Sequence, residues 1–374
     1  MYNPFRYLVF VLSLMPLITG AQTDTLRLVF AGDVMGHLPQ IKSAEVKVNE
    51  AYDYKPCFKY VKPILERADL AIGNLEVTLP GKPPYTGYPQ FRSPDDLARD
   101  LAWAGFDILV TSNNHSNDAG KDGVIKTIET VKANGMFQTG TFKDIDERSA
   151  LYPLMVYKNG FKIAFLNYTY GTNGIPTTAP VIVNLIDTVQ MRKDLEEAKS
   201  MRPHAIIVVM HWGLEYQLAE NAEQRQIAKF LLRHGADLII GSHPHVVQPI
   251  KEETVTDIAG KVKKATVVYS LGNFISNQTK VHTDGGILFE TSLIKNKTTG
   301  NIYFAEQRYI PVFRQLHTDA SGKITYYALP AFQYEGDAQR APSVSPAQHL
   351  ALKTFLTNTR NRLNPAGAVE RKWR

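Results

Sequence analysis

The chain has 374 residues, of which 44% are hydrophobic and 21% are charged. This composition excludes a disordered or fibrous protein and is sufficient for one large α/β domain or two modest ones. The formal net charge is +6, but no run of Lys and Arg and no basic-aromatic stripe accompanies it, so a nucleic-acid partner is not expected. The excess of positive charge is compatible with an anionic substrate.

The first residues have the layout of a secretory signal peptide. Arg6 precedes an apolar segment over residues 7–18, and three small residues follow at 19–21. We therefore expect residues 1–21 to be removed during export, which would place the protein in the periplasm or outside the cell. An uncleaved membrane anchor is the competing interpretation, although the apolar segment is short for a membrane span.

The only cysteine of the chain is Cys57. An exported protein with one cysteine has no internal disulfide, and a single thiolate is a poor basis for a metal site. Any metal site in this chain is therefore expected to use oxygen and imidazole ligands.

Apolar patterns predict alternating strands and helices in the first two thirds of the chain. The expected strands are 26–31, 69–72, 106–110, 154–157, 161–168, 205–210 and 237–240. The expected helices are 57–67, 95–104, 121–133, 189–200 and 222–234. Lys158-Asn159-Gly160 is the expected turn of a β-hairpin, and Gly105, Gly135 and Gly235 are expected to end helices.

The remainder of the chain is expected to be mostly β-structure. The predicted strands are 246–251, 262–270, 287–294 and 301–310, followed by a helix over 347–363. No internal repeat or low-complexity linker divides the chain. The pattern predicts an α/β fold with one domain over 22–330 and a C-terminal helical tail over 331–374.

Side chains typical of metal and acid/base sites follow five of the expected strands. They are Asp33, Glu76, Asn114, His115, His211, His243 and His245. A single residue of this kind is more often a turn former or a structural histidine, but repetition on five strands indicates a shared site, because ligands bind beyond the carboxyl ends of strands in α/β sheets. Oxygen and imidazole ligands suit Zn²⁺, Mn²⁺ or Fe ions, and a carboxylate such as Glu76 can bridge two of them.

The polar motifs occur in a specific order. They are Gly32-Asp33-Val34-Met35, Gly73-Asn74-Leu75-Glu76, Phe91-Arg92-Ser93-Pro94, Ser112-Asn113-Asn114-His115 with Asp118-Ala119-Gly120, His211-Trp212-Gly213, Gly241-Ser242-His243-Pro244-His245 and Ser270-Leu271-Gly272-Asn273-Phe274. This set resembles the calcineurin-like metallophosphoesterase superfamily and, within it, the CapA (poly-γ-glutamate capsule synthesis) family, from residue 26 to about 313. The resemblance implies a four-layer sandwich of mixed β-sheets flanked by helices.

The resemblance also implies roles for single residues. One metal ion would be held by Asp33 and His245, and a second by Asn114, His211 and His243, with Glu76 bridging them. His115 would face the substrate as proton donor, and Asp118 is placed with it in the catalytic group.

Two departures from the superfamily pattern affect these assignments. Met35 occupies the position of a usual second ligand, and His37 could replace it only if the loop curls back. Glu76 stands where Asp is more usual, which lengthens the reach of the carboxylate. One of the two metal ions is therefore expected to be held weakly or not at all.

Three residues in polar loops are expected to contact the substrate: Arg92, Tyr170 and Asn273. Lys121 is a further candidate for an anion contact. A solvated surface position is the alternative interpretation for Arg92, Tyr170 and Lys121.

Two functions remain open. The first is an exported metal-dependent hydrolase acting on a phosphoester, on poly-γ-glutamate or on an envelope glycan. The second is a non-catalytic component of a capsule export apparatus, bound to membrane partners.

Overall fold

The computed structural model describes residues 22–46, 51–337, 340, 342, 344–364 and 368–372. The predicted signal peptide, residues 1–21, lies outside the described residues. Within the described part of the chain, no helix is both long enough and apolar enough to cross a membrane.

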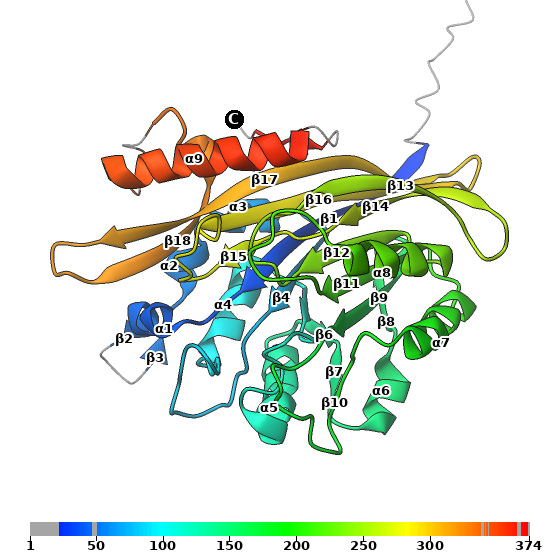
Figure 1. Ribbon diagram of the computed structural model, residues 1–374, viewed down its shortest axis with the longest axis horizontal. Helices are drawn as coiled ribbons and strands as arrows, with labels where there is room; N and C mark the ends of the chain where they lie inside the picture. The colour runs from blue at the N-terminus through cyan, green and yellow to red at the C-terminus, as the bar shows by residue number, and fades with distance from the viewer. Residues whose placement is uncertain are drawn as a thin grey trace, which may run out of the picture.

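A mixed β-sheet of nine strands forms one half of the molecule (Figure 1). Its strands are β1 (Thr23–Val34), β4 (Leu70–Leu75), β5 (Ile108–Val110), β6 (Phe137–Thr139), β15 (Asn273–Ile275), β16 (Gly285–Asn296), β17 (Ile302–Thr318), β18 (Ile324–Pro330) and β19 (Val369–Glu370). The order is β18-β17-β16-β1-β4-β5-β6, with β15 beside β1 and β19 beside β17. Strands β1, β4, β5 and β6 are parallel, so their carboxyl ends lie at one edge.

A second mixed sheet of six strands packs against the first. Its strands are β8 (Leu154–Lys158), β9 (Phe161–Thr169), β11 (Ala205–His211), β12 (Leu238–Ser242), β13 (Ile250–Thr256) and β14 (Val262–Val268). They run in the order β13-β14-β12-β11-β9-β8, with β9, β11, β12 and β14 parallel. Two short pairs complete the strands, namely β2 (Glu45–Val46) with β3 (Ala51–Tyr52) and β7 (Thr141–Phe142) with β10 (Ile182–Val183).

Helices cover the outer faces of both sheets (Figure 1). Their bounds are α1 (Leu38–Ala44), α2 (Lys55–Phe58), α3 (Lys62–Leu65), α4 (Asp96–Ala104), α5 (Gly120–Ala133), α6 (Ile145–Leu151), α7 (Thr188–Ser200), α8 (Ala222–Arg233) and α9 (Pro346–Leu363). Residues of α2, α3 and α4 share a buried cluster with one face of the first sheet, and residues of α7 and α8 share another with the second sheet.

Strand β1 shows how the sequence produces these layers. Leu26, Leu28 and Phe30 belong to the cluster between the two sheets, whereas Val29 and Ala31 belong to the cluster beneath the helices. Alternate residues of a strand point to opposite faces, so an unbroken apolar run is required where both faces are covered. The predicted four-layer sandwich of helices, two mixed sheets and helices is confirmed.

Two predicted elements differ from the structure, and a proline accounts for each. The expected helix 57–67 is two short helices, α2 and α3, because Pro63 has no backbone N–H and is tolerated only in the first turn of a helix. The expected strand 246–251 is displaced to β13, which starts after Pro249, since a proline cannot donate to a strand ladder. The predicted hairpin turn is confirmed, with positive φ at Asn159 (49°) and Gly160 (78°).

The segment after β18 folds back onto the first sheet. Helix α9 lies along β17 in Figure 1, and its Leu352 and Leu356 are fully buried in a cluster with Phe313 and Leu329. Arg360 of the same helix makes ion pairs with Glu335 and Glu370. The C-terminal residues therefore share core packing with the rest of the chain.

We expect Leu356→Ala to lower the free energy of unfolding by about 2–5 kcal/mol, because it leaves a cavity in this cluster. Leu350→Ala is the matched control in the same helix, since the Leu350 side chain is 68% exposed, and it should change stability by less than about 0.5 kcal/mol. Urea unfolding monitored by tryptophan fluorescence measures both. Equal midpoints for the two variants would show that α9 is not part of the cooperative core.

Candidate metal centre

The two sheets bring seven polar side chains together from the ends of five strands. Asp33 lies at the end of β1, Glu76 follows β4, and Asn114 and His115 follow β5. In the second sheet His211 ends β11, and His243 and His245 follow β12. All seven are at most 4% exposed.

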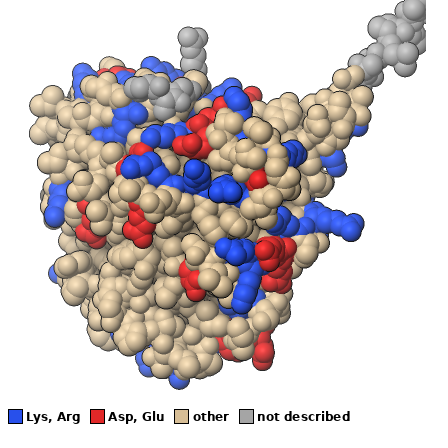
Figure 2. Space-filling model, turned by 45° about the vertical axis from the view of Figure 1, so that its right-hand side comes forward, with Lys and Arg blue, Asp and Glu red and all other residues tan. Residues whose placement is uncertain are grey.

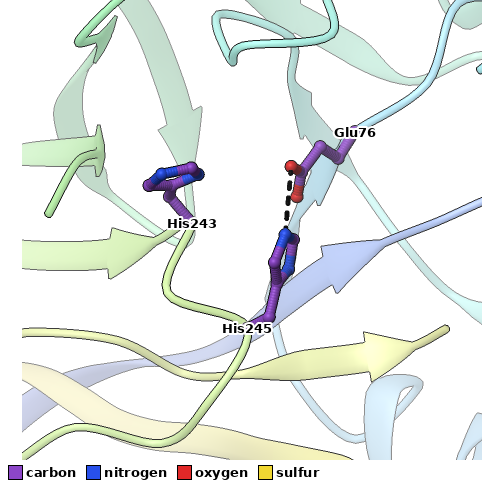
Figure 3. Close-up of side chains that lie close together, drawn as sticks. All are labelled: Glu76, His243 and His245. Carbon is purple, nitrogen blue, oxygen red and sulfur yellow. Dashed lines mark ion pairs between the residues drawn. The ribbon is translucent and has the colours of Figure 1, made fainter. Parts of the chain in front are cut away.

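Glu76 is at the centre of this group. Its carboxylate forms one cluster with His243 and His245 and another with Asp33 and His211, and within each cluster the ligand atoms lie within 4.8 Å of one another. Figure 3 shows the carboxylate facing both histidines of the first cluster, with His245 Nε2 at 3.8 Å from Glu76 Oε1. His211 Nε2 lies 3.5 Å from the same oxygen.

These side chains fit a divalent cation. Both oxygens of Glu76 and Nδ1 of His243 are buried and have no hydrogen-bond partner among the described residues. Burial, and then the nearby Asp33 carboxylate, raise the pKa of Glu76 well above its ordinary value. Burial and neighbouring imidazoles lower the pKa values of His211 and His243, so both rings are neutral, as metal ligands must be. A bound cation would stabilise the ionised Glu76 carboxylate and would be coordinated by the Glu76 oxygens and His243 Nδ1.

Asp33 is in a different environment, because several donors hold it. It accepts hydrogen bonds from Asn74 Nδ2 (2.8 Å) and from the backbone N–H of His243 (3.3 Å), and its Oδ2 is 3.0 Å from His245 Nδ1. Burial alone would raise the pKa of Asp33, but the interactions with His245 and Asn74 outweigh it and lower the pKa. Asp33 is therefore the ionised carboxylate of the pair.

Amide side chains orient two of the imidazoles. Asn74 Nδ2 lies 3.2 Å from His211 Nδ1, and Asn114 Oδ1 lies 2.8 Å from His211 Nε2. Asn273 Oδ1 is 3.1 Å from His245 Nδ1. The sequence interpretation did not select Asn74, although it stands inside the Gly73–Glu76 motif; its amide donates to the Asp33 carboxylate.

His115 is paired with Asp118 beside this centre. Its Nδ1 is 2.7 Å from Asp118 Oδ2, which also accepts a hydrogen bond from the backbone N–H of Phe91 (2.6 Å). The Phe91 ring packs edge-on against the imidazole at 4.6 Å. The ring of His115 is thus fixed, and its Nε2 has no hydrogen-bond partner in the described part of the chain.

The backbone at the His243-Pro244-His245 motif is strained. His243 has a φ of 97° and His245 a φ of 58°, values that residues with a side chain rarely adopt. The preceding Gly241 is required, because a Cβ there would lie 2.0 Å from the carbonyl oxygen of Tyr269. Strain of this kind persists where the surrounding structure imposes it, and it concentrates at functional sites.

The family of the chain follows from comparison with known proteins. The model of the "Bacterial capsule synthesis protein PGA_cap" family matches residues 27–278, which is more than half of the chain. The chain belongs to the PGA_cap family. It is similar to the PGA biosynthesis protein CapA of Bacillus subtilis, with 28% identity over 76% of this chain and 72% of that protein. The capsule biosynthesis protein CapA of Bacillus anthracis is also 28% identical, over 79% of this chain and 74% of that one.

Among solved structures, the chain is similar to the calcineurin-like phosphoesterase YfkN of Bacillus subtilis (TM-score 0.43, 13% identity, 91% of this chain and 97% of that chain). It is also similar to a phosphatase from Mycoplasma pneumoniae (TM-score 0.44, 14% identity, 78% of this chain and 94% of that chain).

The structure locates Met35 and His37, the two residues at the position where the resemblance led us to expect a second ligand. Met35 is 2% exposed and belongs to the apolar cluster beneath the helices. His37 is the N-cap of α1, where its Nδ1 contacts Gln40 Oε1 at 3.1 Å, and burial lowers its pKa to about 4. Neither metal-type cluster of the described residues contains His37. The two clusters place Asp33 with His211 and His243 with His245, each group around Glu76.

The expected substrate contacts occupy different positions around the centre. Tyr170 packs on the His243 ring at 4.5 Å and lines a cavity of about 410 Å³ beside it. The Arg92 side chain has no ion pair or hydrogen bond with the described residues, and its Nε is buried. Asn273 is 1% exposed and contacts His245, so it supports a candidate ligand from behind.

Removing the Glu76 charge should stabilise the metal-free chain. Because the pKa of Glu76 is raised in the folded state, the folded chain keeps a proton on Glu76 at pH values above the ordinary pKa of 4.5, where the unfolded chain has lost it. The folded state is therefore destabilised as pH rises from 4.5 toward the folded-state pKa. Glu76→Gln cannot ionise and avoids this destabilisation. In chelator, urea unfolding should therefore show an advantage for the variant that grows from about pH 5 to about pH 8.

The same experiment with excess Zn²⁺ should make the parent chain more stable than the variant. The variant lacks a carboxylate ligand, so metal binding raises its free energy of unfolding by less. If the variant were less stable than the parent chain in chelator at every pH, a contact within the protein would stabilise Glu76, and the side chain would not require a cation.

Proposed function

We propose that this PGA_cap protein is an exported metal-dependent hydrolase that cleaves a phosphoester during synthesis of a capsule or other cell-envelope polymer. The observation that carries the proposal is the buried Glu76 carboxylate, which has no partner of its own and is shared by two groups of metal-type ligands. In this proposal residues 22–330 form the functional domain, and residues 331–374 are an appended segment packed on it.

The proposed centre holds two divalent ions, Zn²⁺, Mn²⁺ or Fe. Asp33, Glu76, Asn114, His211, His243 and His245 are the proposed ligands. Their oxygen and neutral imidazole donors suit these metals. Bound ions would supply Lewis-acid activation of water and of a phosphoryl oxygen, the chemistry typical of such sites. The chain itself contributes the fixed positions of the donors and a buried, water-poor surrounding.

His115 is the proposed general acid. Asp118 holds Nδ1 of the ring, so the free Nε2 can deliver a proton to the leaving oxygen of the substrate. A positioned acid of this kind contributes about 10²–10⁴-fold to the rate. Phe91 limits the motion of the ring through its own contact and through its N–H bond to Asp118.

The proposed substrate is an anionic polymer or a phosphoester precursor of one. The names of the two CapA relatives support a role in polymer synthesis, and the unpaired Arg92 side chain supports an anionic ligand. On the face shown in Figure 2, basic and acidic side chains lie interspersed and form no continuous basic surface, so nothing on that face favours nucleic acid.

One observation favours a second function, that of a scaffold in a membrane-bound capsule export complex. Met35 fills apolar space where the superfamily has a ligand, so one metal position lacks a donor that catalysis normally uses. In that case the centre would hold one structural ion and the membrane partners would carry the activity.

The two functions differ in the variants that abolish metal binding and turnover. The mature chain from residue 22 should contain about two equivalents of metal and should hydrolyse bis-p-nitrophenyl phosphate. His243→Ala should lose metal, because a ligand is removed. His115→Ala should keep metal and lose turnover by about 10²–10⁴-fold. Elemental analysis and initial rates measure both properties.

His234→Ala is the matched control, because the His234 ring contacts the carbonyl of its own helix at Phe230 and lies outside the centre. It should leave metal content and rate unchanged. Equal loss of metal in the His115 variant would contradict its role as an acid. Well under one equivalent of metal after reconstitution would favour the scaffold.

A further inference from the structure

A second groove lies between residues 279–284 and helix α9. It has a volume of about 500 Å³, and its walls include Lys280, His282, Asp284, Arg314 and Asn358. Asn358 of α9 lies 3.5 Å from His282 Nδ1 and closes one side. The groove contains three basic side chains against one acidic side chain and none of the proposed metal ligands.

Arg314 is the unusual residue of this groove. Its Nε is buried without a partner, and the side chain makes no hydrogen bond or ion pair with the described residues. The Asp284 carboxylate interacts electrostatically with the Arg314 guanidinium, but the two side chains are not within ion-pair distance. Burial lowers the pKa of Arg314 and raises that of Asp284, so the arrangement disfavours both charges.

Three other half-buried arginines of the described residues are compensated, whereas Arg92, like Arg314, has a buried Nε without a partner. Arg148 pairs with Asp194 at 2.8 Å, Arg360 binds two glutamates, and Arg362 donates to the carbonyl oxygen of Val247 at 2.9 Å. Desolvation of a guanidinium without such a partner is unfavourable. A groove wide enough for a ligand, lined by an uncompensated Arg, favours a ligand that brings its own negative charge.

We propose that this groove binds an oxyanion group, a carboxylate or a phosphate, of an extended anionic molecule. Arg314 would bind the group directly, with Lys280 adding positive charge at the rim and the His282 ring lining the groove beside it. At about 500 Å³ the groove is larger than a free phosphate needs, and it is within the size range of sites for larger ligands.

The groove is continuous with the surroundings of the metal centre. Lys280 Nζ lies over the Tyr216 ring at 4.2 Å, and that ring is 6.2 Å from His245. Asn273 Nδ2 donates to the carbonyl oxygen of Thr283 at 3.0 Å, while its Oδ1 contacts His245. An anionic chain bound on Arg314 can therefore extend along residues 280–283 toward the centre.

Binding is tested by isothermal titration of the chain from residue 22, in chelator, with tri-γ-glutamate and with inorganic phosphate as probes. The chelator prevents phosphate from binding through metal. We expect tri-γ-glutamate to bind and Arg314→Gln to weaken it about tenfold or more, the effect of losing a charge-assisted hydrogen bond. Arg314→Lys keeps the charge and should recover part of the affinity.

Arg308→Gln is the matched control, since it removes a cation from the same strand outside the groove. It should leave the affinity unchanged. Because the Arg314 guanidinium has no partner, Arg314→Gln should melt at the same temperature as the parent chain or higher. A lower melting temperature together with unchanged affinity would make Arg314 structural and would overturn the proposal.

The two probes distinguish the sources of the oxyanion. Tighter, Arg314-dependent binding of tri-γ-glutamate supports a carboxylate polymer, and Arg314-dependent binding of phosphate alone supports a phosphate group. If neither probe binds, or if Arg308→Gln weakens binding equally, the groove is not the site. The titration is carried out in chelator and does not measure turnover, whereas the hydrolase proposal is tested by metal content and initial rates, so failure of the hydrolase proposal and failure of this one are separable.

Discussion

A buried carboxylate that accepts no hydrogen bond from the described residues is the constraint on which the rest of the structure depends. Glu76 is 0% exposed and stands at the carboxyl end of β4, a fully buried strand. An isolated charge in such a place is strongly unfavourable, so the side chain must be protonated or must meet a cation. The second sheet supplies His211, His243 and His245 around it and no cationic side chain. Imidazole nitrogens beside a buried carboxylate oxygen are a donor set that suits a divalent metal ion.

The contrast with Asp33 shows how the fold separates two carboxylates within one site. Asp33 receives hydrogen bonds from Asn74 and from the backbone of His243, whereas Glu76 receives none from the described residues. The pKa of Asp33 is lowered and that of Glu76 is raised. Carboxylates whose environments shift their pKa values apart have separate roles. Asp33 is ionised in the absence of a bound cation, whereas the ionisation of Glu76 depends on cation binding.

The residue patterns were sufficient to predict an α/β fold and the edge at which the site forms, and the family resemblance supplied the four layers. Covered parallel strands need apolar residues on both faces, and their carboxyl ends meet, so polar residues after such strands are brought together whatever the loop lengths. Strand β1 and the motifs at Asp33, Glu76 and His243 follow this rule. Prolines changed element boundaries that hydrophobic periodicity alone could not locate, as at Pro63 and Pro249.

The hydrogen bonds that hold the site together could not be derived from residue patterns, because they form between the two sheets; only the resemblance placed Asp33 and His245 together. Asp33 and His245 come from different sheets, and the structure brings Asp33 Oδ2 to Nδ1 of that ring. Asn74 was overlooked for a related reason. Its amide reaches both Asp33 in its own sheet and His211 in the other, a pairing that spacing along the chain does not reveal.

Charge is distributed unevenly on the two sides of the centre, and this restricts how an anionic substrate can lie. The cavity beside Tyr170 and His243 is lined by Glu215 and Glu223, and its walls include no Lys or Arg. The groove between residues 279–284 and α9 is lined by Lys280 and Arg314, with Asp284 as its one acidic residue. A polyanionic chain is repelled by the first surface and attracted by the second. The net charge of the whole protein cannot express this difference, because it is summed over both surfaces.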